Sequence, residues 1–178
     1  MPLVAAIDVG TASARAGIFD AGGRLLARAD SPLDIHQHDG HAEQSSAQIW
    51  QAAATALRAA RAQAAARPEQ IAGLAFDATC SLVLLDRDGR PVTVSTTGDD
   101  RRDTILWLDH RAAAQAEECT RSRHRVLDYT GGTMSPEMQI PKLMWLKRHL
   151  PRSWSRAALA LDLADFLTWR ATANPARS

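Results

Sequence analysis

The chain has 178 residues, 46% of them hydrophobic and 23% charged, with a formal net charge of +1 and two cysteines, Cys80 and Cys119. This composition is ordinary for one globular domain, gives no general attraction to nucleic acid or an anionic membrane, and provides no disulfide framework. No apolar run approaches the ~20 residues of a transmembrane helix, and the N-terminus lacks the features of a signal peptide. Because the two cysteines make no disulfide framework, we expect a cytoplasmic protein.

The first half of the chain predicts three strands, a loop and one long helix. Apolar or alternating runs at Val4–Asp8, Ala14–Asp20 and Arg24–Ala29 are typical of strands. Residues 31–44 are mostly polar and are expected to form a loop. Apolar residues then recur at helical spacing over residues 45–67, just before a proline that would end the helix.

The second half predicts further strands followed by helices. An Asp-Arg-Asp-Gly turn at residues 86–89 is expected to join two of these strands as a hairpin. This order of elements, without an extended linker, implies an α/β fold in which helices flank a mixed β-sheet. The expected strands are Ile71–Phe76, Leu82–Leu85, Pro91–Val94 and Ala157–Leu161, and the expected helices are Ala112–Leu127, Pro141–Leu150 and Phe166–Arg170.

The turn after the first strand concentrates residues that suit a phosphate and its metal. Asp8 ends a buried strand, and a carboxylate held there is suited to a hydrated Mg²⁺. Gly10 leaves backbone N–H groups open to phosphate oxygens, while Thr11 and Ser13 add hydroxyl groups. Strand alternation from Ser13 places Arg15 toward the same point. The alternative is an ordinary strand–turn–strand with a surface arginine, and the chain contains neither a Walker A loop nor a Rossmann glycine motif.

The segment from Asp8 to Arg15 resembles the first phosphate motif of the FGGY carbohydrate kinases, which belong to the actin/hexokinase/Hsp70 superfamily. Further segments resemble family motifs in the family's order. They are GHAEQ at residues 40–44 before Trp50, FDATCS at 76–81, WLDHRA at 107–112, and TGGTMSPEMQ at 130–139 before PKLMWL at 141–146. The residues of the DATCS, WLDHRA and SPEMQ segments are most similar to those of the D-ribulokinase-like branch of the family, which acts on pentuloses.

This resemblance implies a ribonuclease H-like lobe and ATP-dependent phosphorylation of a hydroxyl group on a pentulose such as D-ribulose. In that chemistry, positioning and charge stabilisation supply most of the rate. The cofactors implied are ATP and Mg²⁺, and the substrate partner is a small sugar. By resemblance, Asp8 would hold the metal through water, Gly10, Thr11, Ser13 and Arg15 would meet the ATP phosphates, and Thr79, Cys80, Asp109 and Glu137 would bind or border the sugar.

The chain is short for this family, whose members have two lobes and about three times ~150 residues. Residues 1–178 would form a shortened N-terminal lobe, with the C-terminal lobe absent. The family's general base is an aspartate in a later G-x-x-D-A motif, expected beyond residue 178, so we assign no catalytic residue to this chain. We therefore expect the polypeptide alone to lack kinase activity, because general-base help is worth 10²–10⁴-fold. Surface left by the missing lobe makes self-association into a homo-oligomer a further hypothesis.

Two other functions remain open at this point. A non-catalytic sugar- or phosphate-binding module could derive from a kinase lobe and keep the same residues. An actin- or Hsp70-like ATPase would share the phosphate turn, but the DATCS and SPEMQ segments argue against it.

Several other residues have simpler structural interpretations. His36, His38 and His41 allow a zinc site, but solvated loop histidines are favoured because no cysteine is close. Cys80 is expected to be a small polar wall of a pocket and not a reactive thiol. The self-balancing charges of Asp99–Asp103 favour a solvated loop. Trp107 borders Asp109, whereas the tryptophans expected in the core or an interface are Trp50, Trp145, Trp154 and Trp169.

Overall fold

The computed structural model describes residues 1–174, which divide into two compact units. Unit 1 comprises residues 1–35, residues 47–79 and the described chain from Leu163 onward. Unit 2 comprises residues 36–46 and 80–162. Among the described residues, no helix has both the length and the hydropathy needed to cross a membrane.

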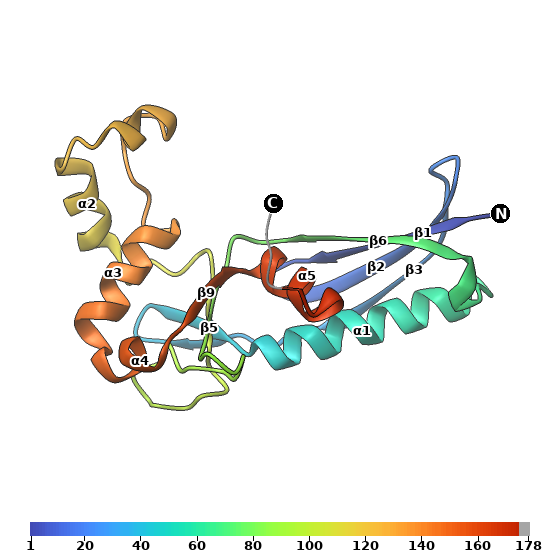
Figure 1. The fold of residues 1–178 in the computed structure, drawn as a ribbon, viewed down its shortest axis with the longest axis horizontal. Coiled ribbons are helices and arrows are strands. Elements are labelled where there is room, and N and C mark those ends of the chain that lie inside the picture. Colours follow the sequence, from blue (N-terminus) through green and yellow to red (C-terminus); the bar gives the residue numbers. More distant parts are fainter. Residues whose placement is uncertain (175–178) are drawn as a thin grey trace. The chain divides into compact units, whose positions relative to one another are not determined.

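Unit 1 is built on a mixed four-stranded sheet in the order β3-β2-β1-β6 (Figure 1). The β1–β2 and β2–β3 pairs are antiparallel, whereas β6 runs parallel to β1. This arrangement confirms the expected α/β lobe with a mixed sheet. The elements of unit 1 are β1 (Leu3–Val9), β2 (Ser13–Asp20), β3 (Leu25–Pro32), α1 (Ser46–Gln63, with its first residue in unit 2), the 3-10 helix η1 (Pro68–Gln70), β6 (Ile71–Ala78) and α5 (Leu163–Thr172).

The two faces of this sheet differ in composition and exposure. Along β1, every odd-numbered residue from Leu3 to Val9 is buried, whereas Val4 and Asp8 are exposed. Helices α1 and α5 lie along the buried face (Figure 1). Small side chains dominate the buried stripe of α1, and α5 adds larger ones. These helix residues are Ile49, Ala52, Ala53, Ala56, Ala60, Leu163, Phe166 and Leu167. The other face remains accessible and carries Asp8 and Arg15.

Unit 2 contains a second sheet, with strand order β4-β5-β8-β7-β9 and antiparallel pairing throughout. In the sequence, the helices of unit 2 come after four of its strands and before the last strand, β9. The elements of unit 2 are β4 (His36–His38), β5 (His41–Gln44), β7 (Leu82–Leu85), β8 (Thr104–Ile105), α2 (Ala113–Arg121), the 3-10 helix η2 (Arg125–Tyr129), α3 (Gln139–His149), α4 (Pro151–Arg156) and β9 (Leu159–Asp162).

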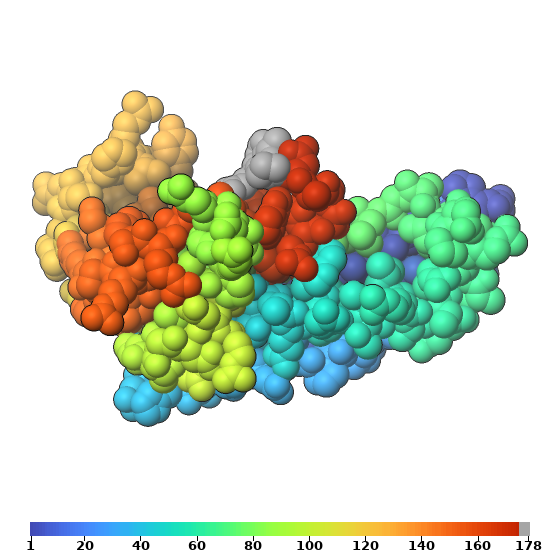
Figure 2. Space-filling model, turned by 60° about the horizontal axis from the view of Figure 1, so that its bottom comes forward, coloured from blue at the N-terminus to red at the C-terminus, as the bar shows by residue number. Residues whose placement is uncertain are grey.

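The core of unit 2 joins β7, the segment that follows it, and α3. Its buried members are Leu82, Leu84, Val92, Val94, Ile105, Ala112, Trp145 and Leu146. The space-filling view shows the yellow-green segment of residues 90–105 against the orange helices α3 and α4 (Figure 2), and an ion pair between Asp100 and Arg156 (3.0 Å) joins the same parts. Segments far apart in the sequence therefore build this unit together.

Unit 2 also holds the main departures from the predicted elements. The predicted loop at residues 31–44 contains β4 and β5, which pair as a hairpin. The predicted strand Pro91–Val94 forms only an isolated bridge from Pro91 to Leu85. A second sheet was not predicted, because β8 is two residues long and leaves no periodic pattern.

The predicted helix Ala112–Leu127 is also wrong in length. Helix α2 ends at Arg121, and η2 follows as a separate element. Arg123 lies between them with a φ of 51°, in the left-handed region that interrupts a right-handed helix. No glycine or proline marks this point, so composition alone predicts a longer helix.

Candidate functional site

The β1–β2 turn brings the predicted phosphate-binding residues together within unit 1. The Gly10 N–H donates to the carbonyl oxygen of Ser13 (3.0 Å), which closes the turn formed by residues 10–12. Asp8 and Arg15 are direct partners across the two strands. Arg15 Nη2 lies 2.9 Å from Asp8 Oδ2, so the prediction that these side chains share one face is confirmed.

The guanidinium of Arg15 lies close to Gly10, so a side chain at position 10 would displace it. A Cβ atom at Gly10 would lie 2.8 Å from Arg15 Nη2, inside van der Waals contact. Thr79 is tied to the same end of the sheet, because its N–H donates to the carbonyl oxygen of Val9 (3.1 Å). Thr11 and Ser13 are both half-buried beside the turn.

A row of charged residues crosses all four strands of the unit 1 sheet. The strand registers place Asp30, Arg15, Asp8 and Asp77 side by side in that order. Three members of the row, all but Asp30, line an open pocket of about 350 Å³. Carboxylate oxygens suit a hard cation, and a guanidinium suits a phosphate. Asp77 was not among the predicted site residues, although it lies in the FDATCS segment.

In unit 2, two predicted sugar-site residues, Cys80 and Glu137, make contacts that involve residues 137–139. Gln139 Nε2 donates to the carbonyl oxygen of Cys80 (3.1 Å). His110 Nε2 lies 3.4 Å from Glu137 Oε1. Cys80 is exposed and Glu137 is half-buried, so both side chains are accessible to a ligand. Residues 137–139 therefore connect the Cys80 segment with the segment that carries His110.

Asp109 is enclosed by donors inside unit 2 and has no solvent exposure. Its Oδ1 accepts from Arg111 N and Nε (both 2.9 Å), and its Oδ2 accepts from Arg111 Nη2 (2.7 Å) and Ala42 N (2.6 Å). Burial alone would raise the pKa of Asp109, but the hydrogen bonds and charge of Arg111 outweigh it and lower that pKa. Because Asp109 has no solvent exposure, the structure gives it a scaffold position inside unit 2.

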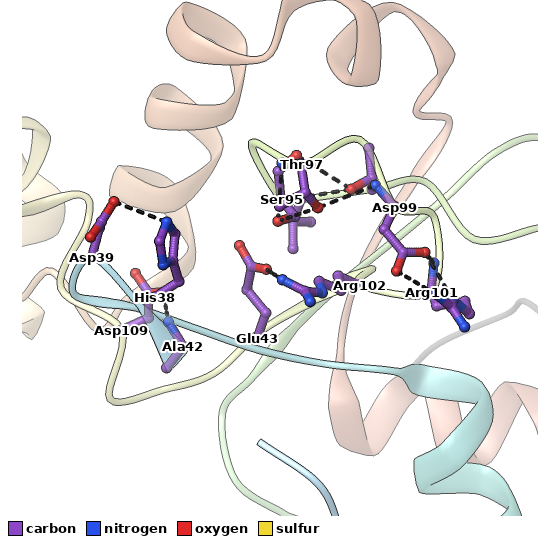
Figure 3. A network of polar contacts seen from close by, with 12 residues as sticks. His38, Asp39, Ala42, Glu43, Ser95, Thr97, Asp99, Arg101, Arg102 and Asp109 are labelled. Atoms are coloured by element: carbon purple, nitrogen blue, oxygen red, sulfur yellow. Dashed lines mark hydrogen bonds and ion pairs between the residues drawn. The ribbon is translucent and has the colours of Figure 1, made fainter. Parts of the chain in front are cut away.

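The same network includes two further residues that were not predicted as functional. The Arg111 side chain is fully buried, donates to Glu43 Oε1 (2.9 Å) and Val94 O (2.7 Å), and lies 4.9 Å from the Trp145 ring. Figure 3 shows Glu43 facing Arg102, whose nearest nitrogen is 4.0 Å away. Glu43 and Arg111 belong to the GHAEQ and WLDHRA segments, so two sequence motifs meet in one buried ion network.

The charged segment Asp99–Asp103 is only partly the solvated loop that was predicted. Asp99 pairs with exposed Arg101 (3.0 Å), as Figure 3 shows. Asp103 is instead fully buried, and its carboxylate accepts from the N–H (2.8 Å) and the hydroxyl of Ser46. Burial raises the pKa of Asp103 to about 6.

The histidines and the core tryptophan also have defined positions. His36 and His38 are exposed on β4, a strand where a loop was predicted. His41 is half-buried, with its ring edge-on to Trp145 at 5.4 Å, and burial lowers its pKa. Within residues 1–174, no group of three or more His, Cys, Asp and Glu side chains is arranged to hold a metal ion. The buried position of Trp145 confirms its predicted core role.

Comparison with known proteins identifies the family. The description "FGGY family of carbohydrate kinases, N-terminal domain" matches residues 3–175. The chain belongs to the FGGY carbohydrate kinase family. This result confirms the family resemblance drawn from the motifs, and the matched region corresponds to the N-terminal domain of FGGY proteins.

Individual relatives agree with this assignment. The chain is 47% identical over 174 residues to an FGGY carbohydrate kinase domain-containing protein of Homo sapiens, covering 97% of this chain and 31% of the relative. It is 39% identical over 176 residues to the D-ribulokinase YDR109C of Saccharomyces cerevisiae, covering 97% and 24%. Among solved structures, a xyloylose kinase from Brucella ovis superposes with a TM-score of 0.81 at 27% identity, covering 94% of this chain and 34% of that one.

The chain spans about a third or less of the length of these FGGY relatives. The expected fold class is confirmed by the solved sugar kinase, which is similar over nearly the whole chain. The two sets of candidate residues belong to different units: the phosphate set and Thr79 to unit 1, and Cys80, Asp109 and Glu137 to unit 2.

Proposed function

We propose that this chain is the N-terminal lobe of an ATP-dependent kinase that phosphorylates a pentulose such as D-ribulose. The family match and the 39% identity to a protein named as a D-ribulokinase support this proposal. The observation that carries it is the Asp8–Arg15 ion pair over the Gly10 turn, on the accessible face of the unit 1 sheet.

The unit 1 residues fit the phosphate end of this reaction. The hydroxyl groups of Thr11 and Ser13 supply donors for the ATP phosphates, and Arg15 supplies a guanidinium. Mg²⁺ bound with ATP would neutralise phosphate charge, and Asp8 would hold it through water. Both side chains of the ion pair are about half exposed (46% and 51%), so the pair is accessible to an incoming ligand.

In unit 2, the sugar end of the reaction is assigned to Cys80 and Glu137; Thr79 of unit 1 is assigned to it from the family resemblance alone. Glu137 offers a carboxylate acceptor for sugar hydroxyls, and its contact with His110 (3.4 Å) orients it. Asp109 is assigned an indirect role, because Arg111 and Ala42 hold its carboxylate inside unit 2. The chain alone is proposed to bind ligands without turnover, because the family's general base is expected outside these residues.

Calorimetry with matched variants tests the binding assignments. Mg·ATP is titrated into the wild-type chain, Arg15→Met and the control Arg58→Met, which removes an exposed arginine from α1 in the same unit. Arg15→Met should weaken binding by about 10-fold or more, the effect of losing a charge-assisted hydrogen bond, whereas Arg58→Met should not. D-ribulose is titrated in the same way into Glu137→Gln and the control Glu117→Gln, which changes an exposed residue of α2.

A coupled assay with Mg·ATP and D-ribulose separates the remaining outcomes. Normal turnover by the isolated chain would contradict the proposal that it is inactive alone. Binding of D-ribulose without any binding of Mg·ATP would favour the non-catalytic sugar-binding module. A folded chain that binds neither ligand would contradict both functions.

A further inference from the structure

The chain has two lysines, both in α3, and their environments are opposite. Lys147 is exposed, whereas Lys142 is the largest fully buried side chain of the described residues, with 0% exposure. All other basic side chains except the histidines are arginines. The buried lysine therefore invites a physical explanation that the exposed one does not need.

The ammonium group of Lys142 holds a turn that comes from a distant part of the sequence. Lys142 Nζ donates to Leu106 O (2.9 Å) and also contacts Trp107 O (3.4 Å). Leu106 O also accepts from Asp109 N (3.2 Å). The Trp107 backbone is held from its other side, because its N–H donates to Ser81 Oγ (3.3 Å). The turn of residues 106–109 is thus fixed from two directions.

Burial of this ammonium group is costly, and packing alone does not require it. Burial lowers the pKa of Lys142, and Asp109, Cys80 and Glu137 oppose that shift through space. These are the three predicted sugar-site residues of unit 2. A methionine would fill a similar volume without desolvating a charge. The ammonium is explained instead by the two carbonyl groups that it orients.

Three contacts from one short segment tie the predicted sugar site together. Glu137 contacts His110 (3.4 Å), Gln139 Nε2 donates to Cys80 O (3.1 Å), and Lys142 binds the 106–107 carbonyls. We propose that Lys142 is a positioning residue, which fixes the turn of residues 106–109 against Cys80 and Glu137 so that the sugar meets a preformed surface. This inference rests on the proposed function for its ligand, but its structural part stands on the contacts of Lys142.

The test compares Lys142→Met with Lys147→Met, the same substitution at an exposed position of the same helix. Hydrogen exchange of the Trp107 and Asp109 amides is followed by NMR, together with thermal unfolding and D-ribulose affinity. In Lys142→Met, these two amides should exchange about 10-fold faster or more, while the amides of β7 keep wild-type rates. D-ribulose affinity should fall by a similar factor, and Lys147→Met should change neither quantity.

Each outcome distinguishes positioning from plain stability. A folded Lys142→Met protein with unchanged Trp107 and Asp109 exchange would overturn the proposal, and so would uniform acceleration of all unit 2 amides with unchanged sugar affinity. A wild-type chain that binds no D-ribulose but still shows the local exchange contrast would reject the proposed substrate and keep the structural role of Lys142.

A measurement on the wild-type chain covers the case in which Lys142→Met does not fold. With ¹⁵N-lysine labelling, the chain gives two side-chain signals, and Lys147→Met assigns them. The ammonium protons of Lys142 should be protected from solvent exchange. Rapid exchange at both lysines would overturn the proposal.

Discussion

Asp103→Asn should reduce the pH dependence of stability between pH 4.5 and 8. The Asp103 carboxylate is fully buried and accepts hydrogen bonds from the N–H and hydroxyl of Ser46 and from Thr104 Oγ1 (3.2 Å). Burial raises its pKa from 3.8 to about 6, because these donors only partly replace the water that the charged form loses. Asparagine keeps an acceptor oxygen and removes the ionisation.

The sign and size of the effect follow from proton linkage. Between pH 3.8 and about 6, the native state binds more protons at Asp103 than the unfolded state does. The stability from this group is therefore fully present below pH 3.8 and is lost as the pH rises through about 6. This pKa shift of Asp103 corresponds to a change of about 3 kcal/mol in the free energy of unfolding over the full pH range. About 2 kcal/mol of that change falls between pH 4.5 and 8.

The assay is urea unfolding of the wild-type chain and Asp103→Asn at pH 4.5, 6 and 8. The difference in unfolding free energy between them should move by about 2 kcal/mol in favour of wild type as the pH falls from 8 to 4.5. Asp100→Asn is the control, because hydrogen bonding to Arg156 lowers the pKa of Asp100 and reverses the sign. Asp100 is about half exposed, so its effect should be small. A difference for Asp103→Asn that stays constant with pH would refute this reasoning.

The remaining predictions concern the ion pairs and the sugar candidates. Arg111→Met should lower the unfolding free energy by about 3–5 kcal/mol in urea, because it removes the nearest cation from two buried carboxylates. Arg15→Met should change the same quantity by less than about 1 kcal/mol, since that pair is half exposed. Asp109→Asn should lower the melting temperature together with any D-ribulose affinity, whereas Glu137→Gln should lower affinity and leave the melting temperature nearly unchanged. Equal stability losses for the last two would contradict the buried and accessible roles assigned to them.

The elements of unit 1 were predicted more reliably than those of unit 2, for a physical reason. Strand β1 and helix α1 have one buried face each, so their apolar residues recur with the period of the element. Strand β7 was predicted with its observed bounds because all four of its residues are apolar and buried. β8 has two residues and α4 has six, which is too short for any period to emerge. Contacts with segments distant in the sequence stabilise these short elements: β8 pairs with β5 and β7, and Arg156 of α4 forms an ion pair with Asp100.

In the candidate site too, contacts between residues close in the sequence could be predicted, whereas contacts between residues far apart in the sequence could not. The shared face of Asp8 and Arg15 follows from strand alternation across one short turn, and the sequence predicts it. The burial of Asp109 depends on Ala42, 67 positions earlier, and spacing within WLDHRA does not reveal it. Lys142 lies in the PKLMWL segment that resembles a family motif, but nothing in that segment indicates burial of its ammonium group, since a lysine is normally expected to face solvent.

Ion-pair distance alone does not distinguish Arg15, which is proposed to bind phosphate, from Arg111, which is buried. Arg15 and Arg111 make contacts of similar length with carboxylates, 2.9 Å and 2.7 Å. The half-exposed Arg15 leaves its partner at a cost of about 1 kcal/mol or less, because water or a phosphate replaces the lost contact. The buried Arg111 has no such substitute, so its release costs several kcal/mol. A ligand with an ordinary binding energy would therefore displace Asp8 from Arg15 but would leave the Arg111 network of unit 2 intact.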